Sequence, residues 1–126
     1  MRNAFACNLD GYDSQEWDTN KGQCVFDYII HKYGNVKGFI SSCNIKNLTE
    51  IFEDNTCLEM GVNTNHIEKF CKRFNIPMYA LNENEMIFRV YNPEKRNKHG
   101  ESLMFRISNN HFYAVPKNIK QSIIEN

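Results

Sequence analysis

The chain has 126 residues, 41% of them hydrophobic and 13% aromatic, and its 15 basic and 15 acidic side chains cancel to a formal net charge of zero. This length suits one folded domain with a buried core, spanning residues 1–126, and is too short for two ordinary domains. The zero net charge argues against a nucleic-acid-binding protein. No stretch approaches the roughly 20 apolar residues that cross a bilayer, so no membrane partner is expected.

The cysteines are odd in number and widely spaced, without any Cys-x-x-Cys pair: Cys7, Cys24, Cys43, Cys57 and Cys71. The opening residues lack the long apolar run of a secretory signal. We therefore expect reduced thiols in a cytoplasmic compartment. Because neither end carries a recognisable linker, we also expect the chain to be cut from a longer polypeptide.

Helical periodicity dominates the first half of the chain. Residues 24–33 predict a helix, because Val25, Ile29 and their neighbours recur at the spacing of one helical face. A short helix is expected from Asn47, a candidate N-cap, to about Phe52. Residues 53–60 have the composition of an acidic loop.

A longer amphipathic helix follows and precedes a region of alternating strands. Thr64 is the predicted N-cap of this helix, which runs to Phe74 with its apolar residues on one face. Strands are expected at 77–81, 86–91, 103–107 and 111–115, and a short helix at 117–124. Helices first and an antiparallel β-meander afterwards make an α+β fold.

The two residues with the clearest chemical potential each open an element. Cys24 follows the turn Gly22-Gln23 and begins the first predicted helix, where the positive end of the helix dipole favours a thiolate. His111 begins the last predicted strand, and beside the thiol it would accept the proton of a Cys/His nucleophile. The alternatives are a small core cysteine and an ordinary strand-end histidine.

These residues carry a resemblance to a known family. A helix-start cysteine, followed by a sheet whose last strand begins with histidine and an aromatic residue, resembles the layout of papain-like cysteine proteases. Gly22-Gln23-Cys24-Val25-Phe26 is similar to the Gly-x-Cys-Leu-Phe/Tyr box of OTU deubiquitinases, and Asn110-His111-Phe112 to their Asn-His-Tyr box. Over about residues 20–115, the chain resembles OTU-like domains attached to polymerases and polyproteins of viruses and mobile elements.

The resemblance implies a papain-like, OTU-like fold and a thiol hydrolase that needs no metal or cofactor. Ubiquitin or a ubiquitin-like protein would be the partner, in the host cytoplasm if the protein is viral. Cys24 would attack the scissile carbonyl and His111 would act as the general base. Phe112 is expected to line the narrow channel for a Gly-Gly tail, and Gly22 to let a backbone approach closely.

The chain departs from the OTU pattern at two positions. The family usually has aspartate three residues before the cysteine, where this chain has Lys21, and often a third catalytic residue two places after the histidine, where it has Tyr113. The candidates that would instead orient His111 are Asn109, Asn110 and Asp18. Side-chain donors to an oxyanion are sought among Gln15, Asn20 and Gln23.

Two side-chain clusters offer weaker alternatives. Cys57, His66 and Cys71, with Cys43, contain zinc-binding residue types, but their spacing matches no compact zinc pattern. We therefore expect no metal. The acidic residues between Glu50 and Glu59 would suit the basic tail of a modifier, although a solvated surface is the simpler interpretation.

Three functions remain open from the sequence. The leading hypothesis is a cysteine isopeptidase that removes ubiquitin or a related modifier. The alternative is a catalytically inactive OTU-like module that binds protein within a larger viral or mobile-element protein, which the two departures favour. A nucleic-acid-binding accessory domain is the third, and the zero net charge speaks against it.

Overall fold

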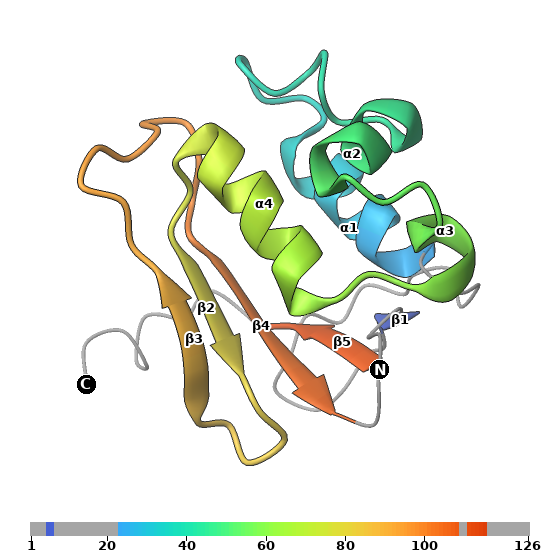
Figure 1. Ribbon diagram of the computed structural model, residues 1–126. Helices are drawn as coiled ribbons and strands as arrows, with labels where there is room; N and C mark the ends of the chain where they lie inside the picture. The colour runs from blue at the N-terminus through green and yellow to red at the C-terminus, as the bar shows by residue number, and fades with distance from the viewer. Residues whose placement is uncertain (1–4, 7–22, 109–110, 116–126) are drawn as a thin grey trace.

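The computed structural model describes residues 5–6, 23–108 and 111–115, and within them four helices pack over one face of a mixed sheet (Figure 1). The element order is β1, α1, α2, α3, α4, β2, β3, β4, β5. The coarse prediction of a mixed α+β domain, with helices before the main strands, is therefore confirmed. The predicted helix at 117–124 lies outside the described residues.

Helix α1 spans Gln23–Tyr33 and matches the predicted helix to within one residue. Its buried side chains include Val25, Phe26 and Ile29, which share the face that packs into the core. The helix ends where the Gly34 N–H donates a hydrogen bond of 2.7 Å to the carbonyl of Ile30.

Helix α2 spans Ile45–Phe52 and begins earlier than predicted, because Asn44 and not Asn47 is its N-cap. The Asn44 backbone is extended, and its side-chain oxygen accepts the Asn47 N–H at 2.9 Å. Helix α3, Cys57–Met60, is a single turn within the segment predicted as an acidic loop. The buried Cys57 side chain anchors this turn to the core.

Helix α4 spans Thr64–Phe74 and has the predicted apolar face, but its N-cap is Asn63. The Asn63 side chain accepts the His66 N–H at 3.1 Å, and the Asn63 N–H donates to His66 Nδ1 at 3.1 Å. This reciprocal capping box uses histidine where glutamate or glutamine is usual. The extended backbone that a cap requires is supplied one residue before Thr64.

The strands are β1 (Phe5–Ala6), β2 (Met78–Leu81), β3 (Ile87–Tyr91), β4 (Leu103–Ser108) and β5 (His111–Ala114), in the sheet order β1-β5-β4-β2-β3. Strand β4 runs parallel to β2, and β1 runs parallel to β5. The prediction of an antiparallel meander is therefore wrong. The other two pairs, β2–β3 and β4–β5, are antiparallel as expected.

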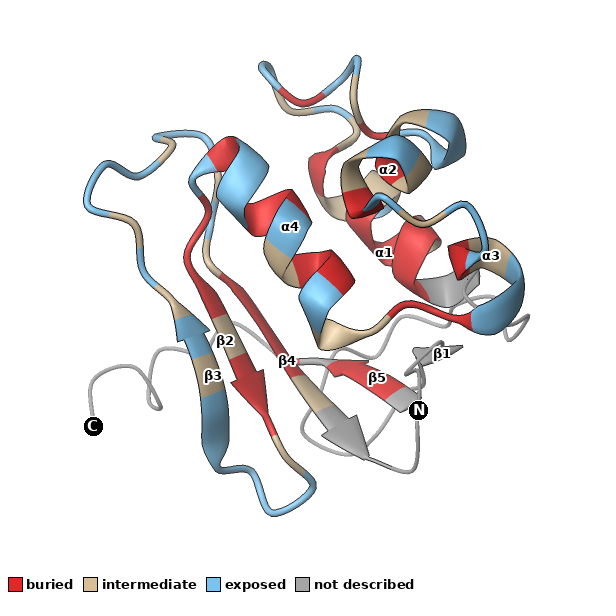
Figure 2. Cartoon of the chain, viewed as in Figure 1, coloured by how far each residue is buried: buried red, intermediate tan, exposed pale blue. Residues whose placement is uncertain are grey.

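Burial explains why β4 and not β3 occupies the centre of the sheet. Three consecutive β4 residues, Leu103, Met104 and Phe105, are buried, which requires cover on both faces of the sheet. Strand β3 is mostly exposed, as Figure 2 shows, and lies at the sheet edge. The chain passes over the end of β2, where the Leu103 N–H donates to the carbonyl of Pro77 at 2.8 Å.

The two faces of the sheet belong to separate apolar clusters. Met78, Ala80, Leu103, Phe105 and Phe112 join the main core beneath the helices. The opposite face holds a smaller cluster of Leu81, Met104 and Val115, with Tyr79 packed against it. Alternating β2 and β4 residues therefore serve different faces, as the two-residue period of a strand requires.

Candidate functional site

The backbone places the two predicted catalytic residues at the starts of their elements. Cys24 is the second residue of α1, which begins at Gln23. His111 is the first residue of β5. The first backbone N–H groups of a helix have no partners inside the helix, so Cys24 lies where an anion would be stabilised.

Strand β1 contacts α1 and pairs with the start of β5. Helix α1 contacts β1, and β1 pairs with β5 in the register that sets Phe5 opposite His111. One turn after Cys24, the Tyr28 ring lies with its centroid 5.3 Å from that of Phe112, the residue after His111. Figure 1 shows α1 above the part of the sheet formed by β1 and β5. The chain folds so that the two elements that carry Cys24 and His111 pack together.

Several predicted site residues lie outside the described residues. They are Gln15, Asp18, Asn20, Gly22, Asn109 and Asn110. Gln23 is the first residue of α1. The structure therefore describes the framework of this candidate site and leaves its third catalytic residue and its oxyanion donor as sequence-based predictions.

Phe112 is a core residue. Its side chain is 1% exposed, and its ring stacks on Phe105 with centroids 5.2 Å apart. Together with the Tyr28 contact, this burial gives Phe112 the role of fixing β5 against α1. An open channel wall would need a solvent-facing ring, so the predicted channel lining does not agree with this position.

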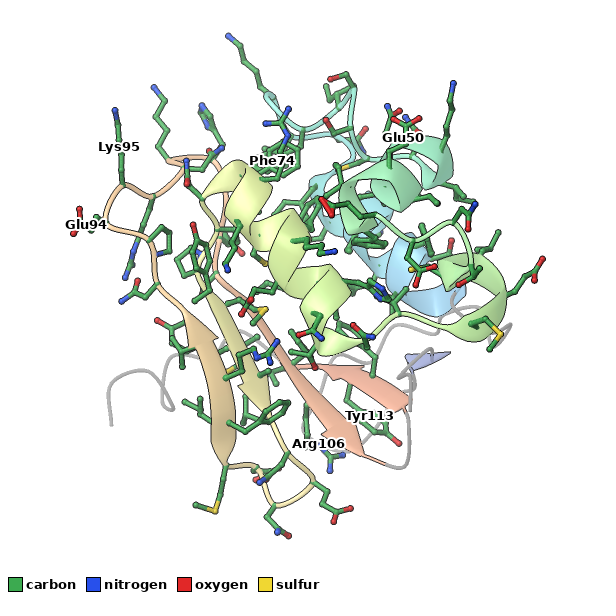
Figure 3. The ribbon with its side chains drawn as sticks, viewed as in Figure 1. Glu50, Phe74, Glu94, Lys95, Arg106 and Tyr113 are labelled. Carbon is green, nitrogen blue, oxygen red and sulfur yellow. The ribbon has the colours of Figure 1, made fainter. Side chains whose placement is uncertain are left out.

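Tyr113 is occupied by a different interaction. The guanidinium carbon of Arg106 lies 4.6 Å from the centroid of the Tyr113 ring, and Figure 3 shows the two side chains together. This is cation–π geometry between neighbouring strands β4 and β5. A phenol held in this way is no substitute for the carboxylate that the OTU pattern often has at this position.

A second cysteine–histidine pair lies on the helical side of the molecule. His66 Nδ1 is 3.5 Å from the sulfur of Cys57, and His66 Nε2 is 3.2 Å from Oδ2 of Asp54. The other oxygen of Asp54 accepts hydrogen bonds from the backbone N–H and the hydroxyl of Thr56. This order of thiol, imidazole and carboxylate is also the order in a cysteine-protease triad.

The surroundings of this pair point to a structural role. Cys57 is 0% exposed and His66 is 6% exposed, so an acyl substrate would not reach the sulfur in this conformation. His66 Nδ1 already accepts the N–H of Asn63 in the capping box. Asp54, Cys57 and His66 together tie α3 to the N-terminus of α4. Residue type alone indicates Cys57 and His66 in the sequence, whereas Asp54, in the segment predicted as an acidic loop, has no sequence signal that places it beside them.

Asp54, Cys57 and His66 are also residue types that bind metal ions, and one donor atom from each lies within 4.8 Å of the others. Cys57 and Asp54 face different nitrogens of the ring, so one ion would not meet both at their present positions. Within the described residues, Cys43 and Cys71 do not join the cluster. Burial raises the pKa of the Cys43 thiol to about 11 and also raises that of Cys71.

The acidic segment considered as a site for a basic tail is partly neutralised within the chain. Glu53 pairs with Lys69 at 3.3 Å, and Asp54 faces His66. A shallow groove between α2 and α4 is lined by Glu50 and Glu53 on one side and by Lys69, Lys72 and Arg73 on the other. This mixed lining does not favour a strongly basic ligand.

Comparison of the chain with protein-family models, curated proteins and solved structures finds no match. Among the described residues, none of the helices combines the length and the apolar character that crossing a membrane requires.

Proposed function

We propose that the protein is a cysteine hydrolase that cleaves ubiquitin or a ubiquitin-like modifier from other proteins, with Cys24 as nucleophile and His111 as general base. The observation that carries this proposal is the packing of α1 and β5 around β1, which brings the elements that begin near Cys24 and at His111 to one region of the fold. The proposed OTU-like identity rests on the sequence boxes around these two residues.

The reaction would follow the chemistry of thiol hydrolases. The Cys24 thiolate attacks the carbonyl carbon of the modifier's last residue, and the oxyanion receives N–H donors at the start of α1. His111 gives its proton to the departing lysine amine, leaving a thioester on Cys24. Water attacks the thioester while His111 takes its proton, and the free thiol and the modifier's carboxylate result. Asn109 or Asp18 would hold the imidazole in the required orientation.

The burial of Cys57 argues against the second cysteine–histidine pair as the catalytic one. Cys57 has the described histidine and carboxylate partners, but its side chain is fully buried beneath α3 and α4. A nucleophile must approach within bonding distance of a polypeptide carbonyl, which needs an open position. The proposal therefore assigns the nucleophile to Cys24, whose place in the first turn of α1 favours a thiolate, and gives Cys57 a structural role.

Hydrolysis of a modifier carrying a fluorescent amide at its C-terminus tests the assignment. Cys24→Ala is expected to abolish turnover, and His111→Ala to lower kcat/KM by at least about a hundredfold. Cys57→Ala and Cys43→Ala are the matched controls, since both remove a thiol away from the proposed site. Equal activity in wild type and Cys24→Ala would overturn the proposal.

A binding module of the same fold is the second candidate, and Tyr113 favours it. The ring at this position is held by Arg106, where an active OTU enzyme often has its third catalytic residue. Such a module would bind a modifier with equal affinity in wild type and Cys24→Ala, without turnover in either. Turnover that depends on Cys24 would remove this candidate.

A further inference from the structure

Exposed apolar side chains gather on one strand. Seven large hydrophobic side chains are exposed in the described residues, and four of them are consecutive or nearly so: Met86 at 65%, Ile87 at 41%, Phe88 at 51% and Val90 at 49%. The first directly precedes β3 and the other three belong to it. Clustering of this kind on one element marks an interaction surface more often than scattered exposure does.

The backbone of the same strand is available for pairing. Strand β3 lies at the edge of the sheet, and its strand partner in the described residues is β2. Natural proteins usually protect such edges with proline, lysine, a short strand or a β-bulge. The five residues of β3, Ile-Phe-Arg-Val-Tyr, contain one charge and no proline, and a register shift against β2 places a bulge at Phe88.

Opposite charges lie at the two ends of β3. The turn before it carries the exposed side chains of Glu83 and Glu85. The loop after it carries exposed Lys95, Arg96 and Lys98 against one carboxylate, Glu94, and Figure 3 shows Lys95 and Glu94 reaching outward from this loop. The strand therefore runs from an acidic end to a basic end.

We propose that two copies of the chain associate through β3, edge to edge and antiparallel, to form a dimer with one continuous sheet. Reversal of the second strand sets the acidic turn of each copy beside the basic loop of the other. The contact is thus self-complementary, as a two-fold interface must be. A short apolar peptide would match the strand but would bring no charges that complement its acidic and basic ends, so a second copy is the occupant that fits.

A register centred on Arg89 would align the apolar side chains. Ile87 and Val90 lie on the sheet face away from α4, because they pair with Leu81 and Tyr79 of the smaller cluster, and the register shift between these two pairs leaves Phe88 in a β-bulge. The two Arg89 side chains would be neighbours, and each has its own Glu68 carboxylate 3.9 Å away and a hydrogen bond to Asn65.

Charge reversal provides a test with an internal check. Sedimentation equilibrium at protein concentrations from micromolar to millimolar is expected to show that the wild-type protein forms a dimer. The double variants Glu83→Lys/Glu85→Lys and Lys95→Glu/Arg96→Glu should each shift to monomer, because each then brings like charges together at both ends. Mixed in equal amounts, the two variants should form a heterodimer, since both end contacts are again between opposite charges.

Two further variants separate strand pairing from general effects of charge. Val90→Lys should prevent the dimer while leaving the thermal unfolding midpoint within a few degrees of wild type. Lys46→Glu/Glu59→Lys, with exposed positions on α2 and α3, is the matched control and should leave the dimer intact. A wild-type protein that stays monomeric throughout the concentration range, or charge variants that do not restore each other, would overturn the proposal.

Discussion

The ring of Tyr28 on α1 packs 5.3 Å from the ring of Phe112 on β5, centroid to centroid. Cys24 lies one turn before Tyr28, and His111 lies directly before Phe112. This contact therefore joins the helix that carries the proposed nucleophile to the strand that carries the proposed base. A change in this contact would alter the spacing of the two elements. The proposed catalysis depends on the distance between the Cys24 and His111 side chains, and small displacements there would lower the rate.

Phe112→Ala should destabilise the fold and disturb the proposed site together. Removing a ring buried against Tyr28 and Phe105 is expected to lower the free energy of unfolding by about 3–5 kcal/mol. Urea unfolding followed by circular dichroism measures this loss. Phe88→Ala, at a half-exposed ring on β3, is the control and should change stability by less than about 1 kcal/mol. Similar losses in both variants would contradict the core role of Phe112.

Thiol labelling should separate the cysteines by burial. Cys57 and Cys71 are 0% exposed and Cys43 is 6% exposed, so all three should react with iodoacetamide slowly in the folded protein. Cys24 should be the residue alkylated first, because a helix N-terminus favours the reactive thiolate. Peptide mapping after brief labelling identifies the modified residue. Rapid modification of Cys57 under native conditions would show that the second cysteine–histidine pair opens to solvent.

The free energy of unfolding should decrease at alkaline pH, because the buried thiols and the buried phenol resist losing their protons in the folded protein. Burial raises the pKa of Cys43 from its usual 9.0 to about 11, and it raises the pKa values of Cys71 and Tyr33 as well. The unfolded chain releases these protons first, so the stabilisation is complete below pH 9 and decreases as the pH rises through 11. Urea midpoints between these pH values test the sign. Cys43→Ala should make the decline shallower, and an unchanged slope would remove Cys43 as a cause.

His66 should contribute to stability through its contacts with Asn63, Asp54 and Cys57. His66→Ala removes the capping-box acceptor for Asn63 and leaves Asp54 without its ring partner, so a loss of about 2–4 kcal/mol is expected. Asp54→Asn, which keeps an oxygen near the ring, should cost less. A double-mutant cycle between positions 54 and 66 measures their coupling energy. Additive effects would mean that the Asp54–His66 contact contributes nothing.

The sequence predicted the positions of the helices well and their first residues less well. Helical periodicity located α1 and α4, because their apolar residues recur on one face. The N-caps of α2 and α4 were predicted wrongly, because each has two candidate residues close together, Asn44 and Asn47 for α2 and Asn63 and Thr64 for α4. Only the backbone conformation distinguishes the candidates. The single turn α3 has too few residues to show any period.

Sheet order depended on contacts between distant residues. The pairing of β2 with β4 joins strands separated by the whole of β3, and no turn residue specifies it. One sequence signal was available, since Leu103-Met104-Phe105 is a continuous apolar run of the kind found in central strands. The cluster of Asp54, Cys57 and His66 was equally hidden, because it needs α3 to turn Cys57 towards α4.

The central claim is that Cys24 is the nucleophile of a modifier-directed hydrolase. The most direct measurement is intact mass after incubation with ubiquitin, or a panel of ubiquitin-like proteins, carrying a C-terminal electrophile. The account predicts one covalent adduct in wild type and Cys57→Ala, none in Cys24→Ala, and slow formation in His111→Ala. Folded wild-type protein that stays unmodified by every probe, or an adduct that survives Cys24→Ala, would contradict it.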